Sequence, residues 1–207
     1  KLDGLYNVES PQAENFKKVL STMVDDVRVI LIKMADRLHN LRTIDGMPKH
    51  KQLKIAAETS YIYAPLAHRL GLYNLKSEYL DICTKITEPD LYRDIVQKLK
   101  DTQKERNKYI AEVIKPLKVK LDLLGIPYKI FGRPKAISSI ANKIKTKKVS
   151  FGEIFDLLAV RIVIDVPKEQ EKSWCWQIYS IVTDVHKPIP ERLRDWITTP
   201  KSNGYES

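Results

Sequence analysis

Three polar residues are spaced as a ligand-binding stripe on a helix would be. Asp36, Asn40 and Thr43 occupy positions i, i+4 and i+7 of an apolar-periodic segment, so they lie beside its buried face. A carboxylate next to an amide can hold a hard or borderline cation and a polar ligand. Spacing alone favours the alternative, a solvated helix face. His39 could pair with Asp36, but a lone histidine here is more often an ordinary helix residue.

A basic segment offers a place for phosphate groups. Residues 133–148 contain six basic and no acidic side chains, and we predict a helix over 133–147 opened by Arg133 and Lys135. Backbone N–H groups at a helix start, together with mobile cations, favour polyphosphate binding. Without further context, the basic segment fits a solvated helix face as well as a polyphosphate site.

Two further segments could take part in nucleotide chemistry. Asp156 precedes an apolar strand predicted over 157–165, where a carboxylate could hold Mg²⁺ against phosphate oxygens, although Asp is also a common turn residue. Near the end of the chain, Lys201 supplies charge, Asn203 begins an Asn-Gly turn, and Tyr205 offers a flat face for a base. The alternative there is a hairpin turn with a core tyrosine.

Composition narrows the partners and the compartment. The chain has 207 residues, 43% of them hydrophobic, and a net charge of +10, so it can form a core and suits an anionic partner. Two cysteines outside any paired motif fit a reducing compartment. No apolar run approaches the roughly 18–20 residues of a membrane span, and no secretion signal opens the chain. We expect a soluble cytoplasmic protein with no membrane contact, cut at both ends.

Apolar periodicity places the elements. We expect a first helix that begins near Gln12, with Ser10-Pro11 as its start and an apolar face through Met23. Further helices would cover 28–44, 52–70 with a kink at Pro65, and 75–86, and a long helical stretch would follow over 88–124. A strand over 126–131, a helix over 133–147, a strand over 157–165, a helix over 174–186 and a strand over 193–198 would follow. The predicted class is α+β, with an all-helical unit joined to an α/β unit.

Taken in order, these motifs resemble the RelA/SpoT homologue family of guanosine tetra- and pentaphosphate enzymes. Residues 35–43 (ADRLHNLRT) and 63–71 (YAPLAHRLG) are similar to its HD-type hydrolase domain. Residues 132–135 (GRPK), 155–161 (FDLLAVR) and 200–205 (PKSNGY) are similar to its nucleotidyltransferase-like synthetase domain. The resemblance implies a hydrolase part over 1–87, a helical linker over 88–124 and a synthetase part over 125–207.

The same resemblance implies roles for individual residues. Asp36 would bind Mn²⁺, and Asn40 and Thr43 would contact the guanosine nucleotide in the hydrolase site. In the synthetase site the residues would divide between ATP (Arg133, Lys135, Ser139, Lys143), catalytic Mg²⁺ (Asp156) and GDP or GTP (Lys201, Asn203, Tyr205). The partners would be these nucleotides and guanosine tetra- or pentaphosphate, with any ribosome association through regions outside this chain.

This sequence lacks parts of the family pattern, which leaves other interpretations of its function to be considered. The His-Asp pair of the hydrolase and the later catalytic Glu of the synthetase are not in this sequence, so we expect that the chain alone performs neither reaction in full. Rival interpretations are a parent enzyme with one of the two activities and a basic helical module that binds RNA or a membrane surface.

Overall fold

The computed structural model describes residues 26–154 and 156–200. The first predicted helix, which begins near Gln12 with Ser10-Pro11 at its start and has an apolar face through Met23, lies outside the described residues. The predicted α+β class is confirmed, because helices dominate and the strands form one small sheet. Among the described residues no helix is long and apolar enough to cross a membrane.

Four helices form the first group of the fold, which we call the helical group. They are α2 (Val27–Arg42), α3 (Lys49–Glu58), α4 (Ala64–Arg69) and α5 (Tyr73–Thr87). A short 3-10 turn over Ile44–Gly46 follows α2. Their apolar stripes meet in one core, whose largest members are Ile30, Met34, Leu41, Ile44 and Tyr79. Burial of these side chains is the main term that holds the four helices together.

The helix predicted over 52–70 is interrupted just before Pro65. Residues Thr59–Tyr63 form a π turn between α3 and α4, in which the N–H of Ala64 donates to the carbonyl of Thr59. Pro65 has no N–H to offer, and its ring would crowd the carbonyl four residues earlier. The wider π turn absorbs this conflict, so the predicted kink takes the form of a local change in helix type.

The stretch predicted as one long helical run is two helices. Helix α6 (Pro89–Asp101) and helix α7 (Gln103–Asp122) are separated at Thr102. The Thr102 hydroxyl donates to the carbonyl of Lys98 at 2.8 Å, and the guanidinium of Arg106 donates to the carbonyl of Leu99. The Leu99 carbonyl thereby gains a partner at the end of α6, and the Lys98 carbonyl, which already accepts the N–H of Thr102, gains a second one.

Strand β1 (Tyr128–Pro134) and strand β2 (Leu158–Ile164) form a two-stranded antiparallel sheet, with Tyr128 opposite Ile164 and Gly132 opposite Val160. The strand predicted over 157–165 agrees closely with β2. The strand predicted over 126–131 corresponds to β1, which continues further along the chain, to Pro134. Helix α8 (Ile137–Lys147) therefore begins later than the predicted residue 133. The N–H of Lys135 donates to the carbonyl of Leu157, which extends the backbone pairing past the strand end.

The third predicted strand, over 193–198, is wrong. Residues 190–192 form a 3-10 turn, and the carboxylate of Asp195 then accepts hydrogen bonds from the backbone N–H groups of Ile197 and Thr198 at 3.1 and 2.8 Å. An aspartate that bonds its own following backbone favours a turn over an extended strand. Before it, helix α9 (Lys168–Val185) begins earlier than the predicted residue 174.

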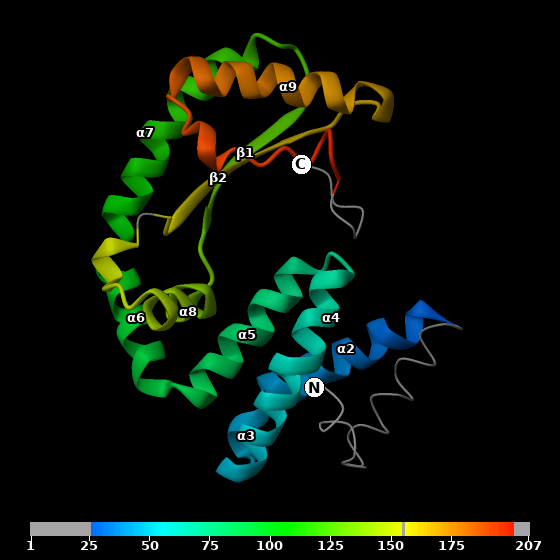
Figure 1. The fold of residues 1–207 in the computed structure, drawn as a ribbon, viewed down its shortest axis with the longest axis vertical. Helices are drawn as coiled ribbons and strands as arrows, with labels where there is room; N and C mark the ends of the chain where they lie inside the picture. The colour runs from blue at the N-terminus through cyan, green and yellow to red at the C-terminus, as the bar shows by residue number, and fades with distance from the viewer. Residues whose placement is uncertain (1–25, 155, 201–207) are drawn as a thin grey trace, which may run out of the picture.

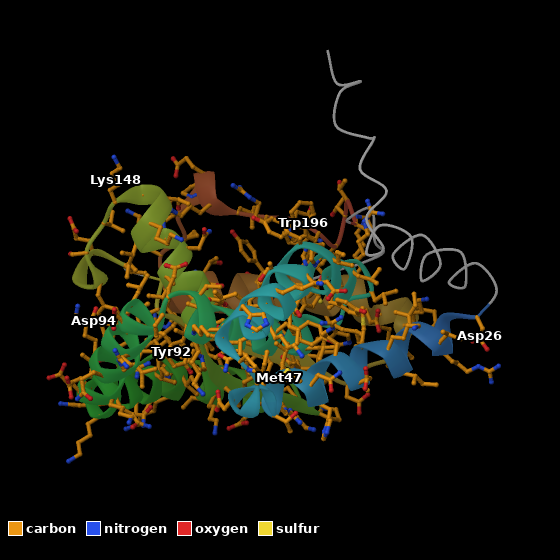
Figure 2. The ribbon with its side chains drawn as sticks, turned by 90° about the horizontal axis from the view of Figure 1, so that it is seen from below. Asp26, Met47, Tyr92, Asp94, Lys148 and Trp196 are labelled. Atoms are coloured by element: carbon orange, nitrogen blue, oxygen red, sulfur yellow. The ribbon has the colours of Figure 1, made fainter. Side chains whose placement is uncertain are left out.

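Helix α5 lies between the rest of the helical group and α8 (Figure 1). A second core joins α6 with α8 through Ile95, Ile140 and Ala141, and a third joins α7 and α9 to the sheet. At the end of α8, Lys148 adopts a left-handed conformation and projects from the molecule (Figure 2).

Gly132 on β1 lies close to the side chain of Ile110 on α7. A Cβ atom at this position would lie 2.6 Å from Cδ1 of Ile110. Real Cβ atoms do not come so close to a neighbour, so a side chain here would displace Ile110 or the strand. The glycine of the GRPK segment therefore has a packing role next to its basic neighbours.

Candidate functional site

The polar stripe of α2 forms as the spacing predicts. Asn40 Nδ2 donates to Asp36 Oδ2 at 3.2 Å, which fixes the amide beside the carboxylate. Thr43 ends the helix, and its hydroxyl donates to the carbonyl of His39 at 3.0 Å. Asp36 and His39 are both exposed. The stripe is therefore an accessible surface with one carboxylate, one amide and one hydroxyl.

Buried contacts hold α2 in place behind this stripe. The phenol of Tyr79 on α5, which is fully buried, donates to the carbonyl of Met34 at 2.6 Å. Burial raises the pKa of this phenol well above its usual value, so it remains a hydrogen-bond donor. Arg37 forms an ion pair with Glu58 at 3.1 Å and lies over the ring of Tyr63 at 4.4 Å. Asp36 is thus presented from a helix whose other face is fixed.

The basic segment and Asp156 meet in one ion cluster. Lys135 Nζ and Lys143 Nζ both donate to Asp156 Oδ2, at 2.9 and 2.5 Å. The hydrogen bond from Lys143 and then that from Lys135 lower the pKa of Asp156 to about 2. We call Lys135, Lys143 and Asp156 the phosphate cluster. It combines a carboxylate, a group able to hold a divalent cation, with two ammonium groups, which are able to bind phosphate oxygens.

The basic residues reach the site from three different elements. Arg133 lies on β1, Lys135 lies in the connection, and Ser139 and Lys143 lie on α8. The prediction that Arg133 and Lys135 open the helix is therefore wrong. The antiparallel pairing of β1 with β2 keeps Arg133 in the strand, and helix geometry starts only after the extended residue Ala136.

A pocket of about 260 Å³ is lined by residues of the helical group, of both strands and of α8. Two of the residues that the sequence analysis assigned to ATP, Arg133 and Ser139, line it. Lys76 on α5 and Arg161 on β2 also line it, and the sequence argument did not single out either as a site residue. Arg161 could have been suspected as a site residue, because inward-facing and outward-facing side chains alternate along the strand. Lys76 could not, because only the packing of α5 against α8 brings it here.

The two carboxylates, Asp36 and Asp156, have different polar partners. Asp36 with Asn40 offers a carboxylate and an amide, and Asp156 is one carboxylate already bound by two lysines. Over residues 26–154 and 156–200, no three His, Cys, Asp or Glu side chains are grouped to hold a metal. Both carboxylates fit a metal as single ligands whose remaining donors come from elsewhere, such as phosphate oxygens. Lys201, Asn203 and Tyr205 lie outside the described residues.

Comparison with known proteins gives two family matches in the order of the two sites. Residues 6–73 match the HD domain, and residues 132–207 match the region found in RelA/SpoT proteins. The chain belongs to the RelA/SpoT family. The α2 stripe lies in the HD match, and the phosphate cluster lies in the RelA/SpoT match.

Several curated RelA/SpoT proteins are similar over almost the whole chain. A guanosine-3′,5′-bis(diphosphate) 3′-pyrophosphohydrolase of Vibrio cholerae is 41% identical over 100% of this chain and 29% of its own length. A GTP pyrophosphokinase of Myxococcus xanthus is 40% identical over 96% of the chain and 26% of its own length. The bifunctional (p)ppGpp synthase/hydrolase SpoT of Escherichia coli is 37% identical, with coverages of 100% and 29%. The chain thus spans less than a third of these relatives. HD and RelA/SpoT domains generally use divalent metals.

Proposed function

We propose that the protein to which this chain belongs makes and degrades guanosine tetra- and pentaphosphate in a cytoplasmic stringent response. One activity transfers pyrophosphate from ATP to the 3′-hydroxyl of GDP or GTP, and the other hydrolyses the 3′-pyrophosphate of the product. The phosphate cluster is the observation that supports this most directly, since Lys135 and Lys143 converge on Asp156 within the RelA/SpoT match. The hydrolase part is 1–87, the linker 88–124 and the synthetase part 125–207. Any ribosome contact is made by other regions.

In the synthetase site, this proposal assigns ATP to the basic residues around α8. Arg133, Lys135, Ser139 and Lys143 hold its phosphates, and Asp156 holds Mg²⁺. Pyrophosphate transfer needs positioning and charge neutralisation more than covalent help from the protein. Phosphate oxygens compete with the carboxylate for both ammonium groups, so ATP binding releases Asp156 to act as a metal ligand. Lys201, Asn203 and Tyr205 receive GDP or GTP, with the tyrosine ring stacked on guanine.

In the hydrolase site, Asp36 is one ligand of Mn²⁺, and Asn40 and Thr43 contact the guanosine nucleotide. A bound metal of this kind supplies an acidified water as nucleophile. Asn40 holds the Asp36 carboxylate in position through its amide. The ion pair and aromatic contact of Arg37 keep the helix from rotating about this stripe.

Two matched substitutions in the full-length protein separate the activities. Asp36→Ala should abolish release of pyrophosphate from guanosine tetraphosphate and leave synthesis in place, because it removes only the proposed Mn²⁺ ligand. Asp156→Ala should do the reverse. Asp94→Ala is the control, since Asp94 is an exposed residue of α6 that pairs with Lys98.

The measurement is nucleotide turnover, followed by chromatography of guanosine nucleotides with ATP present or absent. Loss of one activity in each variant, with both retained in the control, supports the proposal. Turnover unchanged in both Asp36→Ala and Asp156→Ala would contradict it, as would a wild-type protein that processes neither nucleotide.

A further inference from the structure

The pocket between the helical group and the sheet has walls from two parts of the chain. Lys76 and Ser77 of its lining lie on α5, whereas Arg133, Ser138 and Arg161 lie on β1, α8 and β2. This pocket is therefore complete only when α5 lies against α8, as it does here.

Among the described residues, no ion pair neutralises the positive charge in this pocket. Within the part of the chain that the structure describes, Lys76, Arg133 and Arg161 form no ion pair or side-chain hydrogen bond. Lys135 and Lys143, by contrast, are both occupied by Asp156. Three cations around one hollow attract an anion, and the attraction increases where protein walls exclude water.

Hydroxyl groups add hydrogen-bonding capacity to the same pocket. Ser77, Ser138 and Ser139 line it beside the cations. The Ser138 Oγ atom is buried and has no hydrogen-bond partner among the described residues. A buried polar atom without a partner costs free energy, which a ligand oxygen could recover. Cations with hydroxyl groups are the partners that phosphate oxygens prefer.

Helix α5 is fixed firmly enough to present Lys76 at a defined place. On one side Tyr79 is buried in the core of the helical group and bonds α2. On the other side the Asp81 carboxylate accepts a hydrogen bond from the N–H of Ser138 at 2.7 Å. This contact caps the start of α8, where Ala136 has no side chain able to do so. The distance between α5 and the phosphate-binding helix is thus set by direct bonds.

We propose that Lys76 is a further phosphate-binding residue of the synthetase site, supplied by the helical group. This inference rests on the proposed binding of ATP around α8. The ammonium group of Lys76 binds phosphate oxygens of ATP from the side opposite Arg133. The helical group thereby forms part of the nucleotide site.

The test is Lys76→Ala in the full-length protein, with Lys85→Ala as the matched control. Both lysines lie on α5, but Lys85 is exposed, lies outside the pocket lining and pairs with Asp45. Loss of a charge-assisted contact should raise the KM for ATP about tenfold in Lys76→Ala, with kcat changed little. Lys85→Ala should match wild type, and Lys76→Arg should recover most of the affinity. Calorimetric titration with ATP and AMP completes the design, since a phosphate contact should affect ATP more.

Arg133→Ala separates this inference from the proposed function. If Arg133→Ala weakens ATP binding while Lys76→Ala behaves as Lys85→Ala does, the role of Lys76 is wrong and the ATP site stands. If neither substitution alters ATP binding, the proposed function itself is wrong at this site. Equal loss of ATP and AMP affinity in Lys76→Ala would overturn the phosphate assignment. Circular dichroism of each variant verifies that it is folded.

Discussion

The carboxylate of Asp156 accepts hydrogen bonds from two ammonium groups, and these bonds determine how it titrates. Its pKa is lowered to about 2, by Lys143 first and Lys135 second. Because an unfolded aspartate titrates near about 3.9, the ionised form stabilises the fold above that pH. The contribution is lost as the pH falls from about 4 to 2. It is modest, since half-exposed ion pairs are screened by solvent.

We predict that Asp156→Asn lowers the Tm at neutral pH and that this difference shrinks on acidification. Thermal denaturation followed by circular dichroism at a series of pH values measures it. Asp94→Asn, which affects a carboxylate bound by one exposed lysine, should give a smaller change with pH. A Tm difference for Asp156→Asn that stays constant between about pH 5 and 2 would show that the two lysines do not stabilise the charged carboxylate.

At the scale of elements, α2 depends on α5 for its position. The bond from the Tyr79 phenol to the carbonyl of Met34 lies in the core, and the turn that bears Asp36 follows directly. The bidentate pair between Arg42 and Glu78 is a second link between these two helices, at the surface. The buried link is expected to matter more, because solvent competes with the exposed one.

Tyr79→Phe should therefore lower the free energy of unfolding by about 1–2 kcal/mol, since it removes one buried hydrogen bond and leaves a carbonyl unpaired. Urea denaturation measures this loss. Tyr109→Phe is the control, because that tyrosine is 61% exposed on α7, and it should change stability by less than about 0.5 kcal/mol. Equal stability of the two variants would mean that the Tyr79 hydrogen bond contributes nothing.

Across the whole molecule, the helical group and α8 are joined by polar contacts. Asp81 caps the start of α8, and Glu88 pairs with Lys145 near its end at 2.8 Å. The two cores on either side contain different residues, so these contacts sit between separately packed regions. Removing the cap should loosen α8 without unfolding the helical group.

Asp81→Ala should speed hydrogen exchange of the α8 amides over 137–141 severalfold, because loss of a helix cap costs about 0.5–2 kcal/mol. Exchange in α2 should stay at the wild-type rate. Asp81→Asn retains a hydrogen-bond acceptor, so its exchange rate over 137–141 should lie between those of the wild type and Asp81→Ala. Mass spectrometry of deuterium uptake measures all three proteins. Uniform acceleration over both regions would indicate that the cap supports the whole fold rather than α8.

Local patterns in the sequence were enough for most elements and for the arrangement of the polar stripe on α2. The Asp36 and Asn40 stripe and the β2 strand were predicted correctly, because side-chain spacing along one helix or strand depends on that segment alone. The prediction of a strand over 193–198 is wrong, because the hydrogen bonds of Asp195 favour a turn, which the alternation of apolar and polar residues does not reveal. The predicted start of α8 is wrong because pairing with β2 extends β1 through Pro134.

The remaining features were decided by tertiary structure. The sequence indicated the family motifs and the basic segment, but it could not place Lys76 in the same pocket as Arg133 or Asp81 at the start of α8. Asp81 and Ser138 are separated by 57 positions. Contacts over such a separation depend on how α5 and α8 pack, and packing is set by the summed burial of many side chains rather than by the spacing of a few.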